Sequence, residues 1–403
     1  AYTFVLSRHD EYFADRCSAQ YAGTQNAAED LIQIYIKGAE TIQIWSDIYK
    51  QAAHHAQPPD DAISTVLDRL KAGTTPEKAQ TWFEISLARP TDNDDTHPSL
   101  ADRLQAYGYR YQNGKLPTLP LPVEQTAADS FLGHDIDWAV SLLNAEWQKE
   151  NAQLWQRLHQ GGQMRSQFFQ QLSRRAQAQP LTVEAALKLA LLTAEFESET
   201  AAITQLRSLV QQAPEHAIAN YELGKRLLQT DQPEGLAYLE TAIRQEPLSL
   251  LYCFEPLYRH LKRQGQTDKA ESYLQAFRQL LPTWQRAQKE RQEIGETDPF
   301  IPHTLSPREV EQIIWQLTQF LEVREAYLVQ RQVTYLPESK CYVLGIVSQF
   351  NRQNPMNSLQ SWELVELISQ TLCLSGDVRV VGLNDRPKTL YQRLRHVQGA
   401  KIV

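Results

Sequence analysis

Four prolines recur at nearly constant intervals in the middle of the chain. Pro180, Pro214, Pro247 and Pro282 lie 34, 33 and 35 residues apart. A small residue stands twelve positions before each of the last three prolines and a leucine eight positions before it: Ala202, Gly235 and Ala270, and Leu206, Leu239 and Leu274. Small residues let paired helices approach, leucines fill the seam between them, and proline ends the second helix. A period of this length predicts stacked helical hairpins.

The middle copy carries the most complete pattern, consisting of Tyr221, Leu223-Gly224, Leu227, Gly235, Leu239, Ala242 and Pro247. It resembles tetratricopeptide repeats, although the usual tryptophan is absent and the first helices of the outer copies are weak. The resemblance implies three degenerate copies that form a short helical solenoid over residues 181–290.

The segments before the repeats have a helical pattern. Residues 1–123 read as several helices, with breaks at Gly23–Asn26 and Pro58–Asp61 and a proline-rich connector at 116–122. Pro98 suits the first position of a helix that runs to about Tyr107. Residues 124–180 read as a connector of two or three long helices, broken at Gly161-Gly162. Its tryptophans are predicted core anchors: Trp138, Trp147 and Trp155.

After a polar linker over 291–306, the pattern changes to strands and helices. An alternating run over 327–335 and an apolar run over 342–347 predict strands, followed by a helix near 359–372, a strand at 378–383, a helix at 389–397 and a final strand at 400–403. The fold class is therefore predicted to be mainly α, with a small α/β domain over 305–403. That domain has no G-x-G-x-x-G or P-loop pattern, so no motif supports a nucleotide-binding enzyme.

Charge and cysteine content narrow the function classes. The 403 residues carry a formal charge of −8 and no compact basic run, which argues against nucleic-acid binding. The four cysteines are scattered and form no C-x-x-C pair, so they offer no metal or redox motif. No window of about 18 uninterrupted apolar residues predicts a transmembrane helix.

The chemically richest segment lies near the start, at Ser7-Arg8-His9-Asp10-Glu11-Tyr12-Phe13-Ala14-Asp15-Arg16. Glu11 and Asp15 are four residues apart, so both carboxylates project from one face of a helix. Like charges at this spacing repel by about 0.3 kcal/mol, and a nearby cation would remove that cost. Spacing alone also fits a solvated acidic pair balanced by Arg8 and Arg16.

This segment, followed by small residues and then Asn26-Ala27, resembles the membrane zinc metallopeptidases of the HtpX and CAAX-prenyl-protease type. The resemblance implies that Glu11 is the third protein ligand of a catalytic zinc. It also implies that Asp15 is a second-sphere acceptor that orients a ligand imidazole.

A second segment, Thr96-His97-Pro98 with Arg103-Leu104 after it, resembles the T-H-P-x-x-x-x-R-[ILV] stretch of the same family. The resemblance implies that His97 donates to the oxyanion of the tetrahedral intermediate. It assigns Arg103 to support of the site or to binding of the substrate backbone. Taken alone, His97 also fits a residue at a helix N-terminus beside Pro98.

The family's H-E-x-x-H motif is absent from the ten histidines of this chain. We therefore expect the chain to be the soluble, C-terminal part of a membrane-associated zinc endopeptidase, on the cytoplasmic face and anchored by helices upstream of Ala1. The complete protein would bind zinc and cleave a protein or peptide substrate. This chain alone is expected to bind no zinc and to be inactive, because one carboxylate makes a poor zinc site.

The alternative is a non-catalytic scaffold or adaptor whose repeats bind a peptide or a protein partner. In that interpretation residues 1–123 are a relic of a peptidase ancestor. A scaffold has no need of the set formed by Glu11, Asp15, His97 and Arg103, which favours the peptidase interpretation.

Overall fold

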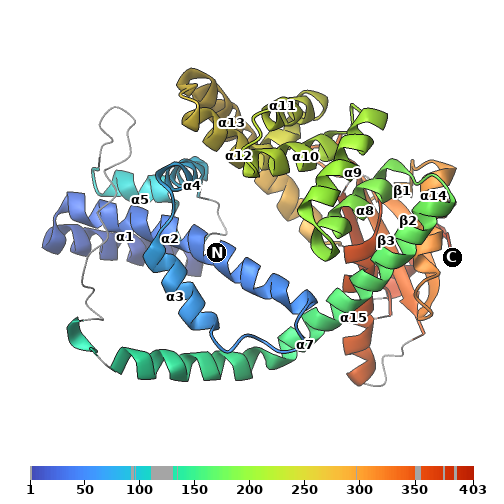
Figure 1. Ribbon diagram of the computed structural model, residues 1–403, viewed down its shortest axis with the longest axis horizontal. Coiled ribbons are helices and arrows are strands. Elements are labelled where there is room, and N and C mark those ends of the chain that lie inside the picture. The colour runs from blue at the N-terminus through green and yellow to red at the C-terminus, as the bar shows by residue number, and fades with distance from the viewer. Residues whose placement is uncertain are drawn as a thin grey trace. The chain divides into compact units, whose positions relative to one another are not determined.

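A computed structural model describes residues 2–91, 95, 97–109, 130–133, 135–295, 297–349, 355–374, 377–384 and 388–403. The chain forms two compact units, residues 1–162 with 250–282, and residues 163–249 with 283–403. Helices predominate, and a small sheet lies near the C-terminus (Figure 1). The predicted fold class, mainly α with a C-terminal α/β domain, is confirmed. No helix in the described parts of the chain is long and apolar enough to cross a membrane.

The first unit is built from helices. They are α1 (Tyr2–Ala22), α2 (Thr24–Lys50), η1 (Gln51–Ala53), α3 (Ala62–Ala72), α4 (Pro76–Ala88), α5 (Leu100–Ala106) and α12 (Leu250–Arg263), with the N-terminal parts of α7 (Asp135–Ala178) and α13 (Thr267–Gln292). Gly23 has φ +87° and lets the chain reverse between α1 and α2, which lie side by side (Figure 1). The predicted break at this position is confirmed.

One face of α2 forms a core with α4 and α5. Its buried members include Leu31, Ile32 and Ile36 of α2, Trp82 and Phe83 of α4, and Leu100 and Leu104 of α5. The helix predicted to start at Pro98 instead starts at Leu100, because the Ser99 hydroxyl accepts the N–H of Asp102 and caps it. Pro98 itself is buried just before the cap.

The predicted break at Gly161-Gly162 is wrong, because α7 runs through it. A Cβ at Gly162 would lie 2.4 Å from the Cα of Ala53, so this glycine permits close packing rather than ending the helix. Of the three predicted core tryptophans, Trp155 is fully buried and Trp147 is partly buried. Trp138 is 68% exposed, so its prediction as a core residue is wrong.

The second unit contains two helical hairpins and the sheet. Its helices are the C-terminal parts of α7 and α13, and α8 (Val183–Phe196), α9 (Glu199–Gln212), α10 (Ala217–Gln229), α11 (Gly235–Gln245), η2 (Pro247–Ser249), α14 (Pro307–Leu317), α15 (Pro355–Thr371) and α16 (Lys388–His396). Leu206, Leu223 and Leu227 lie in the core shared by α8, α9 and α10.

Three of the repeating prolines follow helix ends, as predicted: Pro180, Pro214 and Pro247 come after α7, α9 and α11. Pro282 does not, because it lies inside α13. A proline within a helix costs about 3 kcal/mol, and the neighbouring Leu281 is buried.

The sheet has the order β1-β2-β3-β4, formed by β1 (Phe300–Pro302), β2 (Val323–Arg331), β3 (Cys341–Ser348) and β4 (Asp377–Gly382). β1 and β3 each pair antiparallel with β2, whereas β4 is parallel to β3 and is reached through α15. β1 lies in the segment predicted to be a linker, and β2 ends at Arg331 rather than at Tyr335. The predicted final strand makes a single bridge, between Lys401 and Tyr327.

Both faces of the sheet are covered. Leu328, Leu344 and Ile346 pack against α14 and α15, and Val329, Val343 and Val381 pack against α16. A Cβ at Gly345 would lie 2.9 Å from Leu394 of α16, so glycine lets α16 approach β3 closely. Since side chains of a strand alternate between faces, burial on both sides explains the continuous apolar run over 342–347.

We predict that Gly224→Ala destabilises the α10–α11 hairpin by about 1–3 kcal/mol. A Cβ at Gly224 would lie 2.7 Å from the carbonyl oxygen of Gly235, and a backbone atom cannot move aside as a flexible side chain can. The matched control is Gly38→Ala in α2, where the new Cβ meets nothing within 4 Å. It should raise helix stability by up to about 1 kcal/mol. Hydrogen exchange of the amides of α10 and α2 measures both changes, and equal protection in the two variants would contradict the prediction.

Candidate functional site

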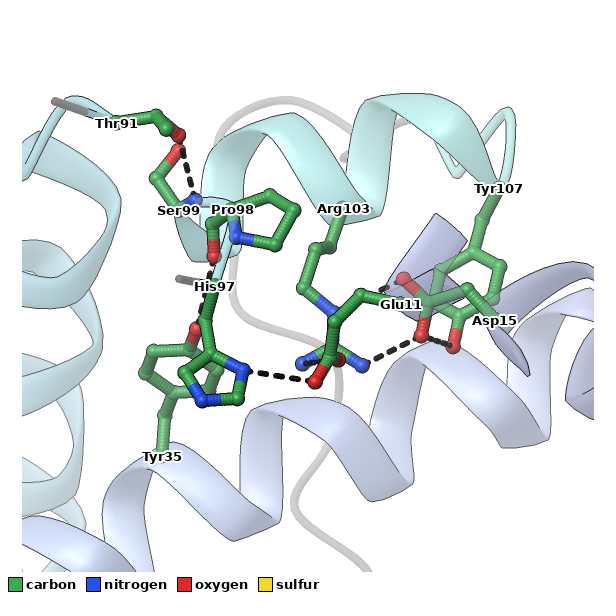
Figure 2. Close-up of polar contacts among 9 residues, drawn as sticks. All are labelled: Glu11, Asp15, Tyr35, Thr91, His97, Pro98, Ser99, Arg103 and Tyr107. Carbon is green, nitrogen blue, oxygen red and sulfur yellow. Dashed lines mark hydrogen bonds and ion pairs between the residues drawn. The ribbon is translucent and has the colours of Figure 1, made fainter. Parts of the chain in front are cut away.

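Residues from α1 and from the region of α5 meet in one polar cluster (Figure 2). Glu11 and Asp15 project from α1, one turn apart. His97 lies just before α5, Arg103 lies within it, and Tyr107 caps its C-terminal end. The structure therefore brings together the four residues singled out from the sequence, across a separation of more than 80 positions.

Arg103 and Asp15 form the buried part of the cluster. Nε and Nη2 of Arg103 donate to the two oxygens of Asp15, at 2.9 and 2.5 Å. The hydroxyl of Tyr107 donates to Asp15 as well, at 2.9 Å. Asp15 is only 3% exposed and the Arg103 side chain 16%, so the pair is largely removed from water. Bidentate pairs of this kind hold the guanidinium in one orientation and also neutralise its charge.

The hydrogen bonds to Asp15 raise the pKa values of the two groups that donate them, Arg103 and Tyr107. Hydrogen bonding to Asp15 holds the pKa of the Arg103 guanidinium above its ordinary range. Burial, and then the bond to Asp15, raise the pKa of Tyr107 to about 12. Both groups therefore keep their protons at neutral pH, and Asp15 remains an acceptor for both.

Glu11 forms the outer part of the cluster. Its Oε1 lies 2.7 Å from Nδ1 of His97, and its Oε2 lies 3.2 Å from Nη1 of Arg103. The carboxylate accepts, so Nδ1 of the imidazole is the donor. The side chain of Glu11 is 25% exposed and that of His97 is 67% exposed. Solvent exposure therefore increases from the buried Asp15 to the pair formed by the carboxylate of Glu11 and the imidazole of His97.

The segment that carries His97 is fastened on both sides. Tyr35 of α2 donates to the carbonyl of Pro98 at 3.4 Å, and Arg8 of α1 donates to the carbonyl of Asp95 at 3.2 Å. The Thr91 hydroxyl accepts the N–H of Ser99 at 2.7 Å. These bonds hold the backbone around His97 against α1 and α2, and Figure 2 shows those of Tyr35 and Thr91.

Tyr107 and Tyr35 were not singled out in the sequence. Tyr107 follows Arg103 by four residues, so the i, i+4 spacing places both on one side of α5 and could have indicated it. Tyr35 comes from a different helix, and burial is the main cause that raises its pKa. No local spacing connects it with His97, so only the tertiary structure reveals it.

The donor set was compared with what a zinc ion requires. A catalytic zinc takes three protein ligands and one open position. Within the described ranges, no three or more His, Cys, Asp or Glu residues lie close enough to hold a metal. Glu11 and His97 are joined to each other by a hydrogen bond, and Asp15 is engaged by Arg103. These residues do not make a zinc site by themselves. Thr96 of the second motif and the connector at 116–122 lie outside the described residues.

No protein-family model matches this chain, and no curated protein matches it at a significant level.

We predict that Asp15→Asn destabilises the first unit by about 3 kcal/mol, because it removes the carboxylate that accepts two hydrogen bonds from Arg103 and leaves the largely buried guanidinium with only the more exposed Glu11 beside it. The control is Asp47→Asn, which removes a carboxylate at 3.1 Å from Arg69 where both side chains are about half exposed. That change should cost less than about 1 kcal/mol. Urea unfolding followed by circular dichroism compares the two variants, and an equal loss of stability would show that the Asp15 pair is no stronger than a surface pair.

Proposed function

We propose that this chain is the C-terminal region of a membrane-associated, zinc-dependent endopeptidase. In the proposal Glu11 supplies one carboxylate ligand of the zinc, and His97 and Arg103 act on the substrate side. The observation that carries it is the contact between Glu11 and His97 at 2.7 Å, with Arg103 bridging Glu11 and Asp15. Two family-like segments far apart in the sequence thus contribute to one polar cluster.

Accessibility supports this assignment. The ion pair that fixes Arg103 is buried, whereas Glu11 and His97 keep exposed surface. This arrangement suits a binding site. The residues that hold the site in place are shielded from water, and the residues that would contact a ligand are exposed to it. A solvated acidic pair would leave both carboxylates exposed, yet Asp15 is 3% exposed.

The cluster also limits how His97 can act. Its Nδ1 donates to Glu11, so Nε2 carries a proton to donate to an oxyanion only when the ring is doubly protonated. Glu11 and Arg103 would hold the ring in place for that role. When bound, zinc would activate a water molecule and polarise the peptide carbonyl. The remaining ligands and the general base would come from outside this chain.

The proposal predicts an H-E-x-x-H motif in the gene upstream of the codon for Ala1. It also predicts that Glu11→Gln in the complete protein weakens zinc binding at least about tenfold, because an amide replaces a charged ligand. Zinc content after dialysis against graded chelator concentrations measures this, and proteolysis of an unfolded protein substrate gives the activity.

The matched control is Asp10→Asn, which neutralises the neighbouring carboxylate of α1. The side chain of Asp10 is 82% exposed and should leave zinc content and activity unchanged. The proposal is wrong if no H-E-x-x-H motif is encoded upstream, or if Glu11→Gln retains zinc as tightly as the unaltered protein.

The second candidate is a scaffold that binds a peptide or protein through its helical hairpins. The observation in its favour is the close contact between α10 and α11, where Gly224 and Gly235 face each other as the repeat pattern requires. A complete protein without proteolytic activity, from which Gly224→Ala releases a bound partner and Glu11→Gln does not, would favour this candidate.

A further inference from the structure

A groove lies between β1, the edge strand of the sheet, and the last helix. Its volume is about 710 Å³. Phe300–Pro302 of β1 line one side, and Arg393, His396 and Val397 of the α16 region line the other. β1 is the outermost strand of the sheet, next to β2 (Figure 1). All of these residues belong to the second unit, so the groove is built within one compact body.

The backbone of β1 forms one wall of the groove. All three consecutive residues of the strand line it, although their side chains alternate between the two faces of the sheet. The N–H of Gln332 donates to the carbonyl of Pro299 at 3.0 Å, which makes these two residues a hydrogen-bonded pair. By the alternation of an antiparallel ladder, Ile301 also faces β2, whereas Phe300 and Pro302 direct their backbone groups outward.

The outward edge therefore offers the N–H of Phe300 and the carbonyls of Phe300 and Pro302. Pro302 has no N–H, so the edge presents one donor and two acceptors over two positions. Within the described residues no strand pairs with this side of β1, and a strand edge of this kind is a template for a further strand. The edge is long enough for a few residues of an extended peptide.

The opposite wall carries positive charge. The guanidinium of Arg393 lies 5.4 Å from the centre of the Phe300 ring and donates to the carbonyl of Asp298 at 2.6 Å, so it is held at the wall. His396 follows one helical turn later and is exposed. None of the described residues that line the groove carries a carboxylate. Although the chain as a whole has a formal charge of −8, this groove therefore attracts a negatively charged group.

We propose that this groove binds an extended acidic peptide, which adds to β1 as an antiparallel strand. The backbone of the peptide would pair with the outward groups of Phe300 and Pro302. Alternate side chains would lie toward α16, where their carboxylates meet Arg393 and His396. This site lies outside the candidate peptidase cluster and is independent of the proposed function.

The test uses the full chain and two fluorescein-labelled hexapeptides, one alternating glutamate with valine and the other lysine with valine. Fluorescence anisotropy should show saturable binding of the acidic peptide and none of the basic one. Two further peptides separate strand addition from simple capture of an anion. Both have the acidic sequence with every second backbone nitrogen methylated, and each is methylated along a different edge of the extended peptide. The one methylated along the edge that pairs with β1 should lose binding by about tenfold or more, and the other should not.

Two charge reversals on α16 provide a matched pair. Arg393→Glu and Arg395→Glu change the net charge equally and lie two residues apart, but only Arg393 lines the groove. Arg393→Glu should weaken binding of the acidic peptide by about tenfold or more, and Arg395→Glu by less than about twofold. Because Arg393 also contacts Asp298 and Phe300, His396→Glu serves as a second variant at an exposed position and should weaken binding in the same direction.

Several results would overturn the proposal. These are no saturable binding of the acidic peptide, equal binding of the basic peptide, an equal loss with Arg395→Glu, or binding of both N-methylated peptides at full strength. If the acidic peptide does not bind saturably, it is not the ligand of this groove. Equal binding of the basic peptide, or an equal loss with Arg395→Glu, would show that the attraction is only non-specific and electrostatic. The last would identify an anion site that does not use the strand edge.

Discussion

Two helices that are remote in the sequence, α1 and α5, are joined by the side chain of Arg103. Its guanidinium binds Asp15 through two hydrogen bonds and also reaches Glu11. Burial of this pair makes it costly to break, since loss of either partner leaves the other largely buried without the charge that it binds most closely. The placement of His97 beside Glu11 depends on α5 being fixed in this way. One interaction therefore both stabilises the unit and arranges its candidate functional groups.

Four members of the candidate site, Glu11, Asp15, His97 and Arg103, were predictable, whereas their contacts and the two tyrosines were not. The four-residue spacing places Glu11 and Asp15 on one helix face, but nothing local links them to Arg103. From the sequence Asp15 was assigned to an imidazole, and in the structure its described contacts are with Arg103 and Tyr107. A carboxylate accepts equally well from an imidazole, a guanidinium or a phenol, so residue type alone does not select among them.

Helices and strands whose apolar residues recur with a clear period were predictable. The predicted helix ends at glycine and proline were wrong where these residues lie within a packed helix. Gly162 and Pro282 both lie inside helices: Gly162 packs closely against Ala53, and Leu281 beside Pro282 is buried. Trp138 was placed in the core on hydrophobicity alone, yet it is exposed. β1 was missed because a strand of three residues, which follows one proline and ends in another, is too short to show a periodicity.

The shortness of β1 has a consequence for the behaviour of the chain in concentrated solution. An open strand edge normally invites sheets of separate molecules to join and aggregate. Here the edge spans three residues and ends in Pro302, which cannot donate to an incoming strand. Beyond it, the segment from Ala400 to Val403 already occupies the same side of β2. The geometry therefore leaves room for a short guest while blocking the long, regular ladder that fibril growth requires.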